Sequence, residues 1–156
     1  MSEITVRKME KQDVEAVSQL EETSFSMPWT RDAFLEMTVQ EDAHYLVAEQ
    51  DGNILGVSGM HLNYGEAEIT NVSVWPEKRG KGIATLLMKH LIREGTECGA
   101  QQFLLEVRVS NASAIHVYKS CGFEIIGTRK NFYEKPWEDA YVMQLKIDNH
   151  KENEKI

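Results

Sequence analysis

The sequence predicts a single α/β (α+β) domain built on a mixed central sheet, with the element order β-α-α-β-β-β-α-β-α-β-β. Two observations carry this expectation. Alternating runs separated by turn signals predict an antiparallel first half, and a strand–helix–strand succession in the middle predicts a crossover. A length of 156 residues fits one domain with one core. We expect residues 1–147 to form this domain and the charged segment 148–156 to be a flexible tail.

Two helices are expected after a first strand over residues 4–9. Apolar residues then recur at the 3.6-residue spacing of a helix, and they are Val14, Val17, Leu20 and Phe25. Pro28 breaks this pattern. A second, short helix is expected over residues 30–39, with Thr30 as its N-cap.

Strands alternate with two more helices in the rest of the chain. The expected strands are 44–49, 54–62, 69–74, 103–107, 123–128 and 140–147. The helices are expected over residues 83–98 and 111–120, with Ser110 or Asn111 as the N-cap of the second. A glycine follows each helix and ends it. The dipeptide Asp51-Gly52 is a hairpin signal between the first two of these strands.

Charge and composition narrow the classes of partner. The net charge of −8 argues against nucleic-acid binding, which rests on neutralising phosphates. It fits either a basic peptide partner or simply an acidic solvated surface. The chain has no apolar stretch of about 18 residues and no signal region, so we expect a cytoplasmic protein without a membrane partner. Cys98 and Cys121 are interpreted as small core residues, and because neither they nor the scattered histidines follow a ligand spacing, we expect no metal.

The segment from residue 74 to residue 85 is the most informative part of the chain. A strand ends at Pro76, Gly80 and Gly82 follow, and a helical pattern begins directly after them. Glycines let the backbone approach a ligand closely, and a helix N-terminus presents unpaired N–H groups and partial positive charge. Residues 78–81 add three cations. The loop therefore suits a polyphosphate, although a tight turn before an ordinary helix is the alternative.

The spacing of this loop is neither that of a Walker loop nor that of a dinucleotide fingerprint. It reads Arg79-x-x-Gly82-x-Ala84 after a strand that ends in Val-x-Pro. This resembles the acetyl-CoA pyrophosphate loop of the Gcn5-related N-acetyltransferase (GNAT) family, and the predicted element order matches that fold. The resemblance implies acetyl-CoA as cosubstrate, held by Val72, Ser73, Val74, Arg79, Gly80, Lys81, Gly82, Ile83, Ala84 and Thr85.

A second segment, residues 105–123, brings an amide, a carboxylate and a phenol together. Asn111 and Tyr118 are seven residues apart and so share one helix face, while Glu106 lies near the end of the preceding strand. Other interpretations stay open. Tyr118 would serve equally as a core aromatic, Glu106 as a solvated carboxylate, and Asn111 as an N-cap alone.

Residues 3–147 closely resemble the bacterial N-terminal alanine acetyltransferases of the RimI type, which modify ribosomal protein S18. The shared motifs are Leu105-Glu106-Val107-Arg108, Ser110-Asn111-Ala112, Tyr118-x3-Gly122-Phe123, Asn131-Phe132-Tyr133, Glu138-Asp139-Ala140 and Pro28-Trp29. The resemblance implies Glu106 as base, Tyr118 as acid and Asn111 as a pantetheine contact. Trp29 and Tyr133 are expected at the peptide site, and Trp29 has the alternative role of a packing anchor.

The sequence therefore predicts an acetyl-CoA-dependent enzyme that acetylates the N-terminal α-amine of a protein. By resemblance, the preferred target is the N-terminal alanine of ribosomal protein S18. The alternatives are an acetyltransferase of the same fold acting on a small amine, such as a polyamine or aminoglycoside, and a non-catalytic acyl-CoA-binding module. The sequence does not decide the oligomeric state.

Overall fold

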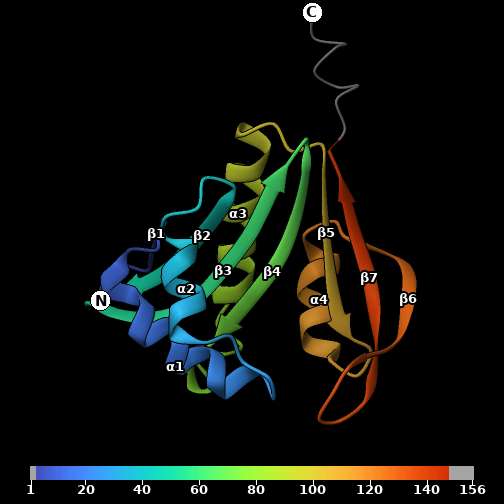
Figure 1. Cartoon of the computed structure of the whole chain (residues 1–156), viewed down its shortest axis with the longest axis horizontal. Coiled ribbons are helices and arrows are strands. Elements are labelled where there is room, and N and C mark those ends of the chain that lie inside the picture. The colour runs from blue at the N-terminus through green and yellow to red at the C-terminus, as the bar shows by residue number, and fades with distance from the viewer. Residues whose placement is uncertain (1–2, 148–156) are drawn as a thin grey trace, which may run out of the picture.

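A seven-stranded mixed sheet organises the chain, with strand order β1-β2-β3-β4-β5-β7-β6 (Figure 1). This computed structural model describes residues 3–147, so the predicted tail 148–156 lies outside the described residues. The strands are β1 Thr5–Lys8, β2 Ala43–Gln50, β3 Asn53–Asn63, β4 Glu66–Val74, β5 Gln102–Arg108, β6 Glu124–Tyr133 and β7 Glu138–Lys146. The α-helices are α1 Val14–Ser24, α2 Arg31–Met37, α3 Ile83–Glu97 and α4 Ala112–Ser120. A short 3-10 turn, η1 Lys11–Asp13, precedes α1, and another, η2 Pro76–Lys78, follows β4.

The predicted element order is confirmed. The crossover from β4 through α3 to β5 determines where the candidate site lies. Strands β1 to β4 pair antiparallel in sequence, and α3 then carries the chain to β5, which runs parallel to β4. This parallel pairing covers only Glu66–Glu68 of β4 and Gln102–Leu104 of β5. Beyond these residues the two strands part, and Figure 1 shows the resulting fork in the sheet.

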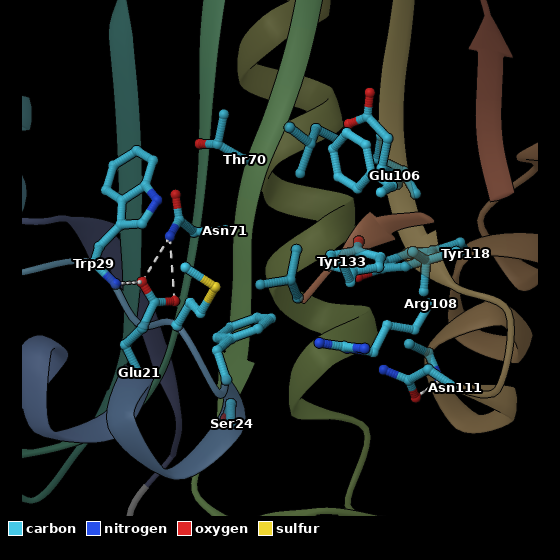
Figure 2. Close-up of a pocket in the computed structure, with 18 of the residues that line it drawn as sticks. Glu21, Ser24, Trp29, Thr70, Asn71, Glu106, Arg108, Asn111, Tyr118 and Tyr133 are labelled. Atoms are coloured by element: carbon cyan, nitrogen blue, oxygen red, sulfur yellow. Dashed lines mark hydrogen bonds between the residues drawn. The ribbon is translucent and has the colours of Figure 1, made fainter. Parts of the chain in front are cut away.

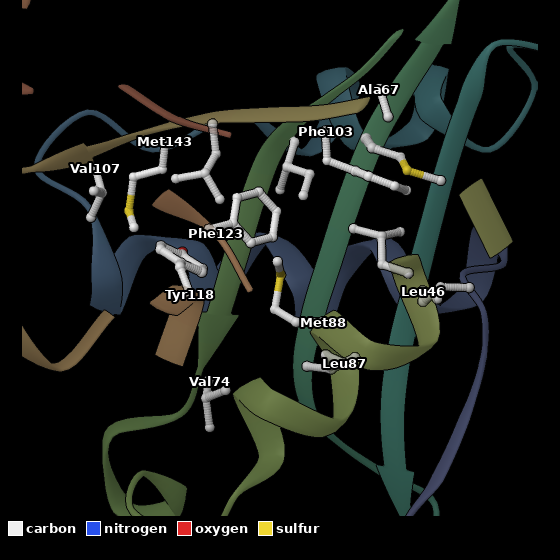
Figure 3. Packing of buried hydrophobic residues seen from close by; sticks show 14 of the residues in the cluster. Leu46, Ala67, Val74, Leu87, Met88, Phe103, Val107, Tyr118, Phe123 and Met143 are labelled. Carbon is white, nitrogen blue, oxygen red and sulfur yellow. The ribbon is translucent and has the colours of Figure 1, made fainter. Parts of the chain in front are cut away.

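Two hydrophobic clusters cover the two faces of the sheet. Successive residues of a strand point to opposite faces, and β2 shows this directly. Tyr45 and Val47 pack with α1 and α2, whereas Leu46 and Ala48 pack in the cluster that contains α3 and Phe103 (Figure 3). The helices α1 and α2 therefore lie on one face, and α3 and α4 on the other.

A β-bulge at Thr70 changes which face the end of β4 presents. Ile69 and Asn71 pair with adjacent residues of β3, which leaves Thr70 as an extra residue. Ile69 packs on the α3 side, but Asn71 and Ser73 point to the α1 side, where both reach Glu21. The bulge thus places polar side chains of β4 against α1 at the fork.

Local capping and turn predictions are confirmed. The Thr30 hydroxyl accepts the Ala33 N–H at the start of α2. Asp51 and Gly52 both have positive φ, 53° and 79°, as a type I′ hairpin turn requires.

Two sequence-based interpretations are wrong, namely that Phe25 belongs to the apolar stripe of the first helix and that Cys98 is a core residue. Phe25 follows α1 with extended backbone and is 40% exposed, since the helix ends one residue before it. Cys98 caps the end of α3 and is exposed, so it is not a core residue. Among the described residues, no helix is long and apolar enough to cross a membrane.

Candidate active site

A cavity of about 370 Å³ lies where β4 and β5 part (Figure 2). It is lined by residues of α1, the α1–α2 segment, β4, β5, α4 and β6, so elements from both faces of the sheet border it. The predicted site residues in its lining are Trp29, Val72, Glu106, Asn111, Tyr118 and Tyr133. The remaining predicted residues, Ser73, Val74 and 79–85, are not part of this lining.

Glu106 is a half-buried carboxylate on β5, on the face of the sheet opposite the Phe103 side chain. Its side chain is 21% exposed, and its Oε1 lies 3.5 Å from Nε of Arg129. Burial raises the pKa of Glu106, repulsion from the Glu68 carboxylate raises it further, and Arg129 lowers it. The net direction is upward. A carboxylate with a raised pKa is a better proton acceptor than a freely solvated one.

Tyr118 combines the two roles that the sequence left open. Its ring packs in the core, with its centroid 6.2 Å from that of Phe123. Tyr118 is a residue of the cavity lining, and within residues 3–147 its hydroxyl has no hydrogen-bond partner. Burial raises the pKa of Tyr118 well above its usual value. The phenol therefore keeps its proton at neutral pH and is free to donate it into the cavity.

Asn111 is the N-cap of α4 and also lines the cavity. Its Oδ1 accepts the Ala114 N–H at 3.2 Å and the Ser113 hydroxyl at 3.3 Å. Because these bonds use only the oxygen, the side-chain NH₂ of Asn111 remains available to a ligand carbonyl.

Trp29 and Tyr133 form opposite walls of the cavity. The Trp29 ring packs against Phe34 and Tyr45, with centroids 5.5 Å and 6.1 Å away, so it is both a packing anchor and a wall. Tyr133 lies beneath the guanidinium of Arg108, and burial raises the pKa of Tyr133 to about 12. Both rings are therefore fixed by contacts with the protein.

The glycine loop has the geometry expected of an anion cradle. Gly80 and Gly82 have φ of +80° and +79°, and a Cβ at either position would meet nothing within 4 Å. The loop is therefore open, and Gly82 is the N-cap from which α3 starts. Arg79 anchors it, because its guanidinium donates to the Val74 carbonyl and the Ser24 hydroxyl, both at 3.2 Å. Ser24 lines the cavity, so the loop borders the site.

Arg108 is a site residue whose role the sequence did not reveal. Its guanidinium donates to the Glu138 carboxylate at 3.2 Å and to the carbonyls of Glu134 and Pro136 at 3.0 and 3.1 Å. It also reaches the Ser26 hydroxyl at 3.3 Å. One side chain of the cavity lining thus connects the α1–α2 segment to the β6–β7 connection.

Glu21 is a second missed residue. It is 1% exposed, lines the cavity, and accepts hydrogen bonds from Asn71 of β4 (Figure 2). A signal was present in the sequence, because Glu21 lies four and seven residues after Val17 and Val14 and so shares their buried helix face. A carboxylate in an apolar stripe is unusual enough to indicate a function.

The forked sheet and the glycine loop at the start of α3 are features of an acyltransferase fold. Comparison with known proteins identifies the family. Residues 14–123 match the acetyltransferase (GNAT) family, and the chain belongs to it. A Bacillus subtilis protein provisionally named [ribosomal protein bS18]-alanine N-acetyltransferase is 39% identical, over 92% of this chain and 95% of its own length.

Solved structures agree with this assignment. The crystal structure of the Escherichia coli ribosomal-protein-S18-alanine N-acetyltransferase superposes with a TM-score of 0.86 at 30% identity, over 94% of this chain and 95% of that one. A Salmonella typhimurium protein of 23% identity, solved with its cofactor acetyl-CoA, shares the fold with a TM-score of 0.82, over 94% and 95% of the two chains.

Proposed function

We propose that this enzyme transfers the acetyl group of acetyl-CoA to the N-terminal α-amine of a protein, with the N-terminal alanine of ribosomal protein S18 as its preferred target. The observation that carries the proposal is one cavity holding the Glu106 carboxylate and the unpaired Tyr118 hydroxyl at the fork between β4 and β5. The named relatives, which are similar over nearly the whole chain, support the choice of acceptor.

The residues of the glycine loop fit acetyl-CoA. Gly80 and Gly82 leave space above the backbone, and the first N–H groups of α3 are suited to a pyrophosphate. After Glu68, β4 makes no ladder pairing with β5, so the backbone groups on that edge of β4 are not used by β5. We assign its backbone groups near Val72–Val74 to the pantetheine arm and the thioester carbonyl, with the Asn111 side chain as a further contact. Acetyl-CoA supplies the activated acetyl group.

The chemistry requires an uncharged amine and a proton for the departing thiolate. Making an α-amine neutral at pH 7 costs about 1–1.4 kcal/mol, whereas a lysine costs about 4.6 kcal/mol. A half-buried carboxylate acting through water suffices for the easier acceptor. We assign this role to Glu106 and assign protonation of the leaving sulfur to Tyr118, whose raised pKa keeps the proton in place.

The chain as a whole is acidic. The chain carries a net charge of −8, which favours approach of a basic protein segment. Trp29 and Tyr133 provide aromatic walls for the first residues of such a peptide. Modification of a ribosomal protein would place the enzyme in the cytoplasm.

Intact-mass analysis with a panel of acceptors tests this proposal. The panel contains alanine-initiated basic peptides, copies with a blocked N-terminus and an internal lysine, and spermidine. The expected result is one added acetyl group on the free alanine terminus alone. Acetylation of the blocked peptide or of spermidine, with none on the free α-amine, would overturn the proposed acceptor and leave the family assignment intact.

A further inference from the structure

Glu21 is a buried carboxylate of the cavity wall that the proposed chemistry does not use. We propose that it is a positioning residue of the acceptor site, whose carboxylate ties the α1–α2 segment carrying Trp29 to the end of β4 at Asn71 and Ser73. The inference rests on the proposed function, because the cavity that Glu21 shapes is the acceptor site of that function.

Three segments of the chain meet at this carboxylate. The Asn71 amide donates to both oxygens, at 3.2 and 2.9 Å, and the Trp29 backbone N–H donates to Oε2 at 3.4 Å. The Ser73 hydroxyl lies 3.5 Å from Oε1. Figure 2 shows Glu21 between Trp29 and Asn71, on the side of the fork opposite Glu106. Glu21 thus joins α1, the α1–α2 segment and β4.

A ring of contacts then closes around the carboxylate. The Tyr45 hydroxyl donates to Asn71 Oδ1 at 2.8 Å, and it lies 2.6 Å from the hydroxyl of the bulge residue Thr70. The Tyr45 ring in turn packs against Trp29. Because Asn71 is held through its oxygen by Tyr45, its NH₂ group is directed at Glu21. The ring therefore fixes Trp29 and the bulge together.

In all the contacts described, Glu21 acts as a hydrogen-bond acceptor. Its partners are an amide NH₂, a backbone N–H and a hydroxyl, and a carboxylate accepts from all three. Burial raises the pKa of Glu21 above its usual value, and the same hydrogen bonds offset only part of this rise. No cation of the described residues pairs with it. Glutamine at this position would direct an NH₂ group at one of these donors and open the ring.

Stability alone gives little reason for a carboxylate here. Val17 and Leu20 already pack α1 on the sheet through fully buried side chains. A well-packed apolar residue is often as stabilising as a buried charged group, or more so. What the carboxylate adds is the placement of polar groups at the fork, and Trp29 and Asn71 both line the cavity.

The test compares Glu21→Gln with Glu22→Gln, an exposed neighbour on the same helix. Peptide KM and kcat are measured with an alanine-initiated peptide, and the Kd of acetyl-CoA is measured separately. Glu21→Gln is expected to raise peptide KM by about tenfold or more, the effect of losing hydrogen bonds to a charged group. The Kd of acetyl-CoA should stay within about threefold of wild type, which is well under a tenfold change in affinity. Glu22→Gln should change neither.

A second variant guards against a folding defect. Asn71→Ala removes the main donor to Glu21 from β4 and should also raise peptide KM. The increase in the double variant should be less than the product of the two single increases, because the two residues share a contact. Unchanged peptide KM in Glu21→Gln and Asn71→Ala, or equal losses in peptide and acetyl-CoA affinity, would overturn the positioning role.

Hydrogen exchange separates failure of this inference from failure of the proposed function. In Glu21→Gln, faster amide exchange is expected in residues 25–30 and 69–74 and not in the β6–β7 connection, whichever acceptor the enzyme uses. If wild type leaves alanine peptides unmodified, the proposed function falls while this readout still decides on the Glu21 contacts. Unchanged exchange in both segments would refute them.

Discussion

The guanidinium of Arg108 lies over the ring of Tyr133, with Cζ 4.5 Å from the ring centroid. The same group reaches Ser26, 82 positions earlier in the chain, and the carbonyl of Glu134. A cation held over an aromatic face and by several hydrogen bonds at once is strongly oriented. Arg108 thus holds the α1–α2 segment and the β6–β7 connection together as a frame beside the cavity.

Replacing Arg108 by lysine should loosen this frame while keeping the charge. Lysine lacks the planar fork and stacks poorly, so it does not replace contacts to several partners. We expect peptide KM to rise by about tenfold, with acetyl-CoA affinity unchanged, since one or two charge-assisted hydrogen bonds are lost. Steady-state kinetics with a varied peptide measure this. Arg93→Lys, at an exposed position on α3, is the control, and wild-type KM in Arg108→Lys would contradict the frame.

Removing the hydroxyl of Tyr118 tests the acid. Tyr118→Phe keeps the ring in the core beside Phe123 and should leave both folding and acetyl-CoA binding intact. We expect kcat to fall by about 10²- to 10⁴-fold, the range for loss of a general acid. Tyr141→Phe, a partly buried tyrosine of β7 outside the cavity lining, serves as the control. Unchanged kcat in Tyr118→Phe would remove Tyr118 from the acid role.

Glu106→Gln tests the base through the pH dependence of kcat/KM. A base works in its ionised form, so activity rises as the pH passes upward through its pKa. Because burial and Glu68 raise the pKa of Glu106, this rising limb of the pH profile should have its midpoint above the usual pKa range of a glutamate. Glu106→Gln should abolish it and leave only the limb of the acceptor amine, near pH 8. A surviving enzyme limb at the wild-type position would point to another base.

Glu68→Gln should move that limb instead of removing it. Glu68 repels the ionised form of Glu106 from β4, Arg129 stabilises it from β6, and Tyr133 stays neutral nearby. Removing the Glu68 charge therefore lowers the pKa of Glu106, and the limb should shift to lower pH. Arg129→Gln should shift it the opposite way. Profiles of both variants that coincide with wild type would show that Glu106 does not set the limb.

Gly82→Val should weaken acetyl-CoA binding by about tenfold or more, which is 1.4 kcal/mol in affinity. At φ of +79° a β-branched residue is strained, and its side chain would fill the open space above the loop. Gly52→Val is a close control, because Gly52 has the same φ and equally open surroundings in a distant hairpin. Equal Kd values for acetyl-CoA in both variants, measured by calorimetry, would refute the role of the loop.

Local signals in the sequence predicted much of the candidate site. The Asn111–Tyr118 spacing places both residues along one helix, and both line the cavity. The position of Gly80 and Gly82 between a strand and a helix predicts unusual backbone dihedrals, and both residues have positive φ. Each of these features depends on neighbours within a few residues, so the linear pattern contains the relevant information.

The order of the elements, the glycine loop and the candidate chemical groups could all be predicted from the amino-acid sequence. The distant residues that complete the cavity could be identified only in the folded structure. The bulge at Thr70 turns Asn71 toward Glu21, 50 positions away in the chain, and a simple alternation along β4 does not reveal this. The contact of Arg108 with Ser26 likewise joins residues 82 positions apart, which only the folded sheet brings together. The physical reason is that such contacts depend on strand register and on the packing of separate elements, which no local periodicity encodes.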